Sequence, residues 1–229
     1  MTMQQAASLE LFTSGDHRPK GLLYQPEFIA PDEEEALLRD IATLPLAEAK
    51  YKAYTARRRI VSFGSSYDFS DNTLHDEIAI PPFLLPLRER AAQWVAIPPD
   101  DFGHALVTEY RPGTPLGWHR DVPQFSVIVG ISLGSPCEMR FRPYPLPSRG
   151  DRNTQHEHRA RGFTLELAPR SVYVLRDDAR WQWQHSIVAT KSLRYSITFR
   201  SRRASAHDHD RATPASHEST LEEKTHERR

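Results

Sequence analysis

The sequence has almost no cysteine and no long apolar run, and these two shortages narrow the classes of protein that it can encode. Cys137 is the single cysteine among 229 residues, which excludes an internal disulfide and zinc sites built on cysteine. No apolar run approaches the roughly 18 residues of a membrane-spanning helix. The first residues, MTMQQAASLELF, have neither the basic start nor the apolar core of a signal peptide. We therefore expect a cytoplasmic protein without a membrane partner.

The chain also lacks a net charge, although it has many charged residues. The chain has 30 basic and 30 acidic residues, so its formal net charge is zero. The two signs are separated along the sequence: acids dominate residues 27–40, whereas residues 50–67 contain five basic residues and no acid. This separation predicts an acidic side and a basic side, a pattern that the overall isoelectric point conceals.

The length and the 38% of hydrophobic residues suit one domain with a sizeable core. Residues 31–44 and 85–95 read as helices, each with a proline in its first turn and an apolar stripe. From residue 106 onward, short and mostly alternating runs predict six or seven strands, among them 126–133, 138–142, 163–167, 171–175, 181–188 and 194–200. The pattern is typical of a mainly β (α+β) protein and fits a β-sandwich or a jelly roll equally well.

Two polar stretches stand apart from these elements. Residues 143–162 are rich in proline, arginine and histidine and predict a long exposed loop. Residues 204–229 have no aromatic side chain and one leucine, so they cannot bury enough apolar surface to order themselves. We expect a disordered tail there, with no catalytic role.

The stretch that suggests chemistry is VTEYRPGTPLGWHRD, residues 107–121, which contains His119 and Asp121. In an extended segment the two side chains point to one face, because side chains alternate along a strand. His185 lies in the alternating run WQWQHSIV, on the same face as Trp181 and Trp183. Two histidines and one carboxylate can bind a non-haem Fe(II) ion and leave positions open. A bare His-x-Asp is also common on solvated strands, and a histidine beside tryptophans is often a core residue.

At these residues the chain resembles the AlkB family of Fe(II)- and 2-oxoglutarate-dependent dioxygenases. The matching pieces are EYRPGTPLGWHRD, VIVGISLGSPCEMRFR, PRSVYVLRDDARWQWQHSI and RYSITFR, which together cover roughly residues 104–200. The resemblance implies a double-stranded β-helix, or jelly roll, with flanking N-terminal helices. It also implies an oxygenase domain over residues 21–203, preceded by an N-terminal extension over residues 1–20.

The resemblance implies a cofactor and two cosubstrates: Fe(II), 2-oxoglutarate and O₂. The iron ligands are then His119, Asp121 and His185, with 2-oxoglutarate taking two of the open positions and O₂ the last. A planar guanidinium matches the distal carboxylate of 2-oxoglutarate, and Arg194 is the residue expected there. The family pattern places Arg200 near the iron-binding end of the same molecule.

Three further residues match the cosubstrate pocket of that family. Tyr110 corresponds to a tyrosine that donates its hydroxyl to 2-oxoglutarate, while Thr108 and Ser196 stand where many members have asparagine. Both replacements keep a hydroxyl, so we expect them to remain in the pocket. Pro123 stands where several nucleic-acid-repairing members have an acid, and a proline side chain offers a base no hydrogen bond.

The substrate is expected to meet the basic run at residues 57–67. In AlkB-like proteins a hairpin in this region covers the active site and grips nucleic acid. The candidates for phosphate contact and base stacking are Arg57, Arg58, Arg59, Phe63, Tyr67 and, beside the first metal ligand, Trp118. The alternative is a solvated edge strand whose charges prevent edge-to-edge pairing.

Three functions follow from these patterns. The first is oxidative demethylation of alkylated DNA or RNA bases, as in dealkylation repair, by a monomer that releases formaldehyde, succinate and CO₂. The second is the same oxygenase chemistry on a protein side chain or small molecule, which Pro123 and the zero net charge favour. The third is a β-sandwich binding module, which the ordered set of His119, Asp121, His185 and Arg194 argues against.

Overall fold

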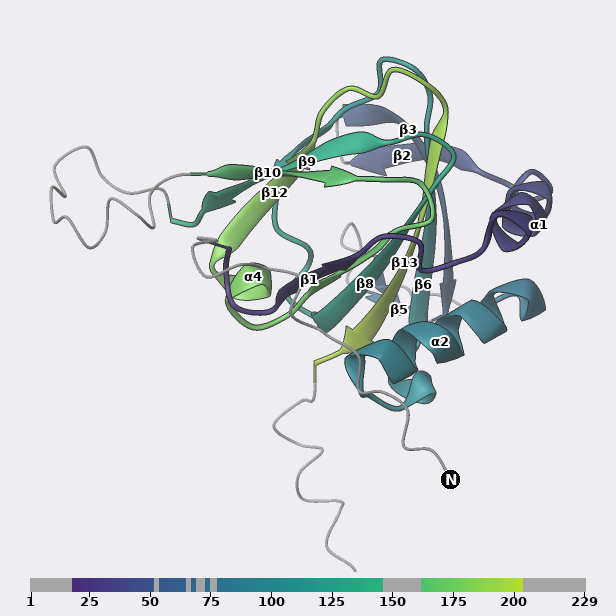
Figure 1. Ribbon diagram of the computed structural model, residues 1–229, viewed down its shortest axis with the longest axis horizontal. Helices are drawn as coiled ribbons and strands as arrows, with labels where there is room; N and C mark the ends of the chain where they lie inside the picture. Colours follow the sequence, from purple (N-terminus) through teal and green to yellow (C-terminus); the bar gives the residue numbers. More distant parts are fainter. Residues whose placement is uncertain are drawn as a thin grey trace, which may run out of the picture.

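Two antiparallel sheets face each other in this protein, and the helices α1 (Pro31–Ile41) and α2 (Leu85–Val95) cover the larger one (Figure 1). The computed structural model describes residues 18–51, 54–64, 67–68, 73–74, 78–145 and 162–203, with backbone alone for residues 50, 51, 54–56, 67, 68, 73 and 74. The expectation of a mainly β jelly roll with N-terminal helices is confirmed. The exposed loop predicted at 143–162 and the tail predicted at 204–229 lie largely outside the described residues.

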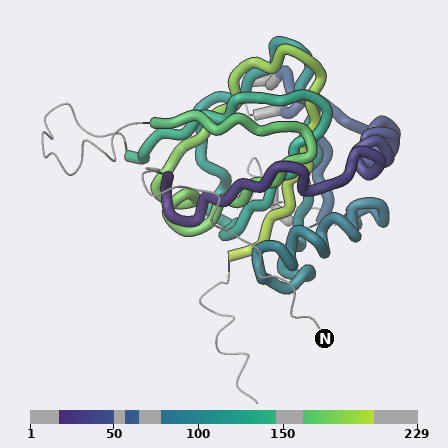
Figure 2. The backbone as a smooth tube through the Cα atoms, viewed as in Figure 1, coloured from purple at the N-terminus to yellow at the C-terminus, as the bar shows by residue number. Residues whose placement is uncertain are grey.

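The larger sheet has seven strands in the order β1-β11-β8-β13-β6-β3-β2. Its strands are β1 (Leu22–Gln25), β2 (Ala47–Tyr51), β3 (Tyr54–Gly64), β6 (His104–Tyr110), β8 (Phe125–Leu133), β11 (Val172–Leu175) and β13 (Arg194–Arg202). Strands far apart in sequence lie side by side: in Figure 2 the purple β1 runs along the green β11, with which it pairs. The last strand, β13, lies between β8 and β6 and so joins the two halves of the sheet.

The smaller sheet has four strands in the order β10-β9-β12-β7. These strands are β7 (Leu116–His119), β9 (Cys137–Pro143), β10 (Phe163–Leu167) and β12 (Trp183–Ile187). The remaining elements are a two-stranded sheet of β4 (Tyr67–Asp68) and β5 (Thr73–Leu74), the 3-10 turns η1 (Pro82–Leu84) and η2 (Pro99–Asp101), and the short helix α4 (Asp177–Trp181). Because β7 is an edge of the smaller sheet, the residues that follow it are free to turn toward the larger sheet.

Apolar side chains form two separate layers. One layer lies between the helices and the outer face of the larger sheet, where Leu37 and Ala91 pack with Val107, Ile197 and Phe199. The other lies between the two sheets and includes residues of both, among them Ile128, Met139, Phe141, Leu175 and Trp183. No helix of the described part is long and apolar enough to cross a membrane.

Helix α1 is shorter than the sequence suggested, ending at Ile41 instead of residue 44. The amide and the hydroxyl of Thr43 both bond the Asp40 carbonyl, which closes the helix with a tight turn. Pro45 follows directly and disfavours a helical backbone at Leu44. Helix α2, by contrast, has the predicted bounds.

The strand expected at residues 181–188 starts at Trp183, so its predicted beginning is wrong. Residues 177–181 form α4, whose first turn contains Asp177 and Asp178, where the helix dipole favours acids. The amide of Gln182 bonds the Asp178 backbone carbonyl, and its side chain bonds the Asp178 carboxylate at 2.9 Å, which ends the helix. Trp181 therefore belongs to the helix and not to the face that carries His185.

The basic run at residues 57–59 lies in β3, which is not an edge strand. Strand β3 pairs with β2 on one side and with β6 on the other. The alternative of a solvated edge is therefore wrong for this segment, and β2 is the edge instead. The alternation of β3 then decides which of its side chains face the space between the two sheets.

Candidate metal and cosubstrate site

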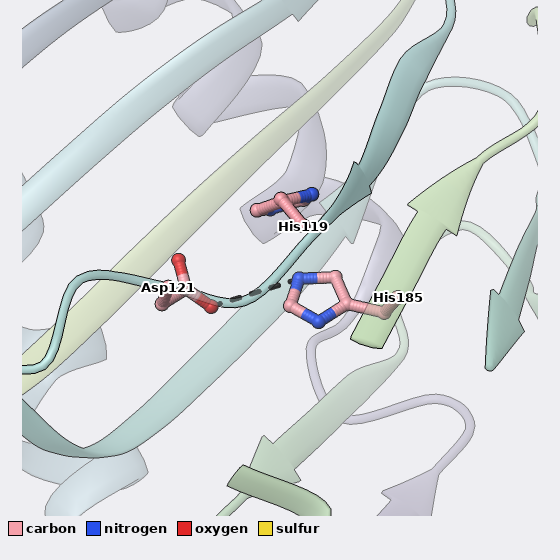
Figure 3. Close-up of side chains that lie close together, drawn as sticks. All are labelled: His119, Asp121 and His185. Atoms are coloured by element: carbon pink, nitrogen blue, oxygen red, sulfur yellow. Dashed lines mark ion pairs between the residues drawn. The ribbon is translucent and has the colours of Figure 1, made fainter. Parts of the chain in front are cut away.

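Three side chains from two segments meet between the sheets. His119 ends β7, Asp121 follows two residues later, and His185 lies in β12 directly opposite His119 in the strand register. One ligand atom of each lies within 4.8 Å of those of the other two, and the histidine rings are 4.2 Å apart. Figure 3 shows the three side chains pointing toward one another. A single ion can be reached by all three.

Hydrogen bonding already orients the first histidine for metal binding. Nδ1 of His119 lies 2.8 Å from the carbonyl oxygen of Gly117. A carbonyl only accepts, so Nδ1 is the donor in this contact, and Nε2 is the nitrogen left for a metal. Metal-binding histidines are commonly held in this way by a partner on their other nitrogen.

The charges of the other two ligands also suit a cation. Burial raises the pKa of Asp121, but Arg200 and the two neighbouring histidines outweigh it and lower the value to about 2. Burial, with help from His119, lowers the pKa of His185 to about 3. At neutral pH the site therefore holds one carboxylate and a neutral imidazole at His185, the forms that bind metal.

Arg200 orients the metal-site carboxylate. Its Nη2 donates to Oδ1 of Asp121 at 3.3 Å, while the other oxygen, Oδ2, lies 3.6 Å from Nε2 of His185. The two oxygens of Asp121 thus have different neighbours, and Oδ2 is the one near His185. Nε of Arg200 is buried without a hydrogen-bond partner among the described residues.

A cavity of about 550 Å³ surrounds these groups and extends along the larger sheet. Four residues of β13 that alternate along the strand, Arg194, Ser196, Thr198 and Arg200, line it. The intervening side chains of Tyr195, Ile197 and Phe199 pack in the layer beneath the helices. Strand β13 thus has a polar side that faces the cavity and an apolar side that faces the helices.

Arg194 is only 1% exposed, yet it forms no ion pair with any described residue. Its Nε donates to Oγ of Ser132 at 3.2 Å, and its guanidinium lies 4.9 Å from the centre of the Tyr110 ring. Nη1 is buried and has no partner among the described residues. A buried guanidinium without an acid is costly. This donor fits an anionic ligand such as the distal carboxylate of 2-oxoglutarate.

The other expected pocket residues lie beside Arg194. Tyr110 is opposite Arg194 in the strand register, and Thr108 is opposite Ser196. All line the cavity, and each of these hydroxyl-bearing side chains is buried. Burial raises the pKa of Tyr110, which keeps its hydroxyl protonated and able to donate.

The six substrate candidates have different surroundings. Arg58 lines the cavity together with Ile60 and Ser62 of the same strand. Phe63 is 4% exposed and packs in the layer beneath the helices, so the expectation that it stacks on a base is wrong. Tyr67 lies in β4, with its side chain outside the described residues.

Arg59 points away from the cavity and has a structural role. Its Nη1 pairs with the buried carboxylate of Glu109 at 3.2 Å, and its Nη2 donates to the Leu46 carbonyl at 2.7 Å. The same carboxylate also accepts from Arg111 and Tyr195. The expectation that Arg59 contacts phosphate is therefore wrong, because alternation turns it to the opposite face from Arg58. Arg57 is exposed and does not line the cavity.

Removing Arg59 should lower stability without touching the chemistry. Arg59→Ala leaves the buried Glu109 with weaker support, and because Arg59 is partly exposed we expect a loss of about 1 to 2 kcal/mol. For a chain of this size that corresponds to a fall in Tm of roughly 2 to 8 °C. Thermal melting followed by circular dichroism measures the change, with the exposed Arg57→Ala as matched control. Equal Tm values for the two variants would contradict the structural role of Arg59.

Trp118 lies at the cavity and is 39% exposed, with the guanidinium of Arg142 4.4 Å from its ring centre. A similar pair lies nearby: the guanidinium of Arg120 is 4.0 Å from the ring centre of the exposed Tyr144. No sequence pattern pointed to Tyr144, Arg142 or Arg120. Trp118 and Arg142 lie on different strands, Arg120 and Tyr144 follow the ends of β7 and β9, and no local pattern pairs them.

These features coincide with a known family. The family model described as the 2OG-Fe(II) oxygenase superfamily matches residues 21–203, and the chain belongs to that superfamily. Its cofactor and cosubstrates are accordingly Fe(II), 2-oxoglutarate and O₂.

Several relatives are named as AlkB homologues, as the sequence suggested. An Arabidopsis thaliana protein named "Alkylated DNA repair protein ALKBH8 homolog" is 29% identical over 185 residues, which cover 73% of this chain and 50% of that protein. A Danio rerio protein named "Probable RNA/DNA demethylase ALKBH6" is 26% identical over 170 residues, covering 74% of this chain and 70% of that protein. The chain thus spans half the length of the Arabidopsis relative.

A solved structure shares the fold. The structure of OsALKBH1 aligns with a TM-score of 0.60 at 17% identity, covering 81% of this chain and 98% of that one. This likeness supports the jelly roll inferred from the two facing sheets.

Proposed function

We propose that this chain is a dioxygenase that removes alkyl groups oxidatively from nucleic-acid bases, with release of formaldehyde, succinate and CO₂. The observation that carries the proposal is the shared cavity, in which a His-Asp-His set and the unpaired buried Nη1 of Arg194 lie together. The set suits a metal, and the guanidinium suits the cosubstrate's carboxylate. We assign the oxygenase domain to residues 21–203 and expect a cytoplasmic monomer.

In this proposal His119, Asp121 and His185 hold the iron, and Arg200 keeps Oδ2 of Asp121 turned toward it. When bound, iron and 2-oxoglutarate supply the oxidation: one atom of O₂ enters a C–H bond of the alkyl group and the other enters succinate. Hydroxylation of an N-methyl carbon leaves an unstable product that loses formaldehyde and regenerates the base.

The pocket residues bind and orient the cosubstrate. Arg194 would pair with its distal carboxylate, and Tyr110, whose ring lies 4.9 Å from that guanidinium, would donate its hydroxyl to the cosubstrate. Thr108 and Ser196 supply two further hydroxyls on neighbouring strands. Being nearly enclosed, the pair of Arg194 and carboxylate acts at low dielectric, where charge-assisted hydrogen bonds are strong.

Nucleic acid is the substrate class that the surroundings favour. The Arabidopsis and Danio relatives are named for DNA repair and for RNA or DNA demethylation. At the cavity, Arg58 offers a charge for phosphate, and the exposed ring of Trp118 offers a surface on which a base can stack. A protein side chain or small molecule is the second candidate, because Pro123 beside the metal site is exposed and has no polar side-chain atom for a base.

The test is product release across a panel of substrates. Single-stranded and duplex DNA and RNA oligonucleotides with N-methylated bases are compared with N-methylated peptides, with added Fe(II) and 2-oxoglutarate. We expect formaldehyde and succinate in equal amounts from at least one oligonucleotide and formaldehyde from no peptide. If only the peptides released formaldehyde, a protein side chain would replace nucleic acid as the proposed substrate.

A variant of Arg58 can distinguish a role of this residue in substrate binding from a role in cosubstrate binding. If it contacts a phosphate, Arg58→Ala weakens oligonucleotide binding and reduces the slope of log K against log salt by about 0.7 to 0.9. The binding of a fluorescent oligonucleotide at several salt concentrations measures this slope, and Arg39→Ala on the exposed face of α1 is the control outside the cavity. An unchanged slope with a raised KM for 2-oxoglutarate would assign Arg58 to the cosubstrate instead.

A further inference from the structure

We propose that Arg180 is a positioning residue for the metal site: together with Arg120 it clamps the segment that bears Asp121 against the helix that leads to His185. The inference rests on the proposed iron site and adds residues to it. Neither arginine belongs to the His-Asp-His set, and both act through backbone atoms. We call these two side chains the arginine clamp.

Arg180 is 3% exposed and gives its hydrogen bonds to main-chain carbonyls of the segment after β7. Its Nε donates to the carbonyl of Phe125 at 3.1 Å, and its Nη2 donates to the carbonyl of Asp121 at 3.0 Å and to that of Val122. Asp121 and Val122 lie in no strand, and Phe125 is the first residue of β8. The guanidinium therefore supplies donors to carbonyls at the point where the chain enters the sheet.

Arg120 closes the clamp from the other side. Its Nη1 donates to the carbonyl of Trp181, the last residue of α4, at 3.0 Å. The Trp181 ring in turn lies near two guanidinium groups, at 4.4 Å from that of Arg180 and 5.2 Å from that of Arg203. The Asp121 segment and α4 thus hold each other's backbone in both directions.

This connection bears on the distance between metal ligands. Helix α4 ends at Trp181, β12 begins at Trp183, and His185 is four residues after the helix end. On the other segment, Asp121 is itself one of the residues whose carbonyl Arg180 binds. The contact of 3.6 Å between Oδ2 of Asp121 and Nε2 of His185 therefore joins two segments that the clamp also joins.

The residue type at position 180 matters, because burying a charged side chain costs free energy and Arg180 is buried. Arg180 has no ion pair with a described carboxylate, so its stabilisation comes from the carbonyls and from the Asp121 charge nearby. A guanidinium presents five donors in a rigid fork and reaches three diverging carbonyls at once. A lysine ammonium keeps the charge but cannot reproduce that fork.

Metal affinity tests the clamp directly. Mn(II) binding is titrated by calorimetry, and bound Co(II) is followed by visible absorption, for Arg180→Lys, Arg120→Met and the control Arg140→Met, whose side chain is exposed on β9. The same titration of Asp121→Ala measures Mn(II) that binds elsewhere on the chain. Loss of a ligand-orienting partner costs about 10- to 100-fold in metal affinity. We expect that rise in the Mn(II) Kd for Arg180→Lys, a smaller rise for Arg120→Met and none for Arg140→Met.

The Co(II) spectrum and Tm separate positioning from simple stability. We expect Arg180→Lys to change the Co(II) bands even at saturating metal, because the ligand geometry changes. A lowered Tm with unchanged Kd and unchanged bands would overturn the clamp. If Arg180→Lys does not fold, an unchanged Kd in Arg120→Met overturns it. If the parent protein binds no more Mn(II) than Asp121→Ala, the iron site fails together with the clamp, which distinguishes the two failures.

Discussion

Asp121→Ala abolishes iron-dependent decarboxylation of 2-oxoglutarate while the protein remains folded. Asp121 supplies the only carboxylate of the three-residue set, so its loss leaves two histidines that hold Fe(II) weakly. It also removes the partner of Nη2 of Arg200, which places an unpaired cation beside the site and repels the metal further. We expect turnover to fall below detection.

The measurement is succinate formation with added Fe(II), at fixed 2-oxoglutarate and with a thermal melt of the same sample. Asp101→Ala is a matched control, because Asp101 is exposed in η2 and distant in sequence from both metal segments. Turnover that survives in Asp121→Ala would remove Asp121 from the metal site.

Arg194→Met raises the KM for 2-oxoglutarate at least about a hundredfold, because leaving a buried carboxylate without its partner costs roughly 3 to 5 kcal/mol. Methionine keeps most of the volume, so the cavity wall stays filled. Among the described residues Arg194 has no carboxylate partner, so its removal leaves none of their acids unpaired. The variant should therefore fold at least as stably as the parent protein.

Two measurements check this prediction. Steady-state kinetics with varied 2-oxoglutarate give KM and kcat, and a melt with and without the cosubstrate gives the stabilisation that binding provides. We expect the parent to gain Tm with 2-oxoglutarate and metal, and Arg194→Met to gain almost none. Arg140→Met again serves as control, and a KM shift of only a few fold would mean that another residue anchors the carboxylate.

Local patterns in the sequence were sufficient for much of the architecture. The bounds of α2 and the alternation of β13 follow from side-chain periodicity, which depends on neighbours a few residues away. The His-x-Asp pair and its downstream histidine and arginine were equally visible, because each is a short string of residue types. Periodicity failed at residues 181 and 182, which were predicted to begin a strand. A short helix that begins with two acids occupies residues 177–181 instead.

The site's supporting contacts depended on the tertiary structure. Alternation divides β3 into two faces but does not say which face meets the cavity, and that decision separated Arg58 from Arg59 and Phe63.

What the sequence predicted by itself is therefore most of the strands after residue 106, the helices α1 and α2, and the residues proposed for the metal and the cosubstrate, because local periodicity and short motifs indicate them. What only the tertiary structure decided is how distant segments meet: His119 opposite His185, Arg200 on Asp121, and Arg180 on the carbonyls of Asp121, Val122 and Phe125. Such contacts join residues dozens of positions apart, and an arginine that binds backbone carbonyls requires no particular residue type in return. No local pattern in the sequence can therefore predict these contacts.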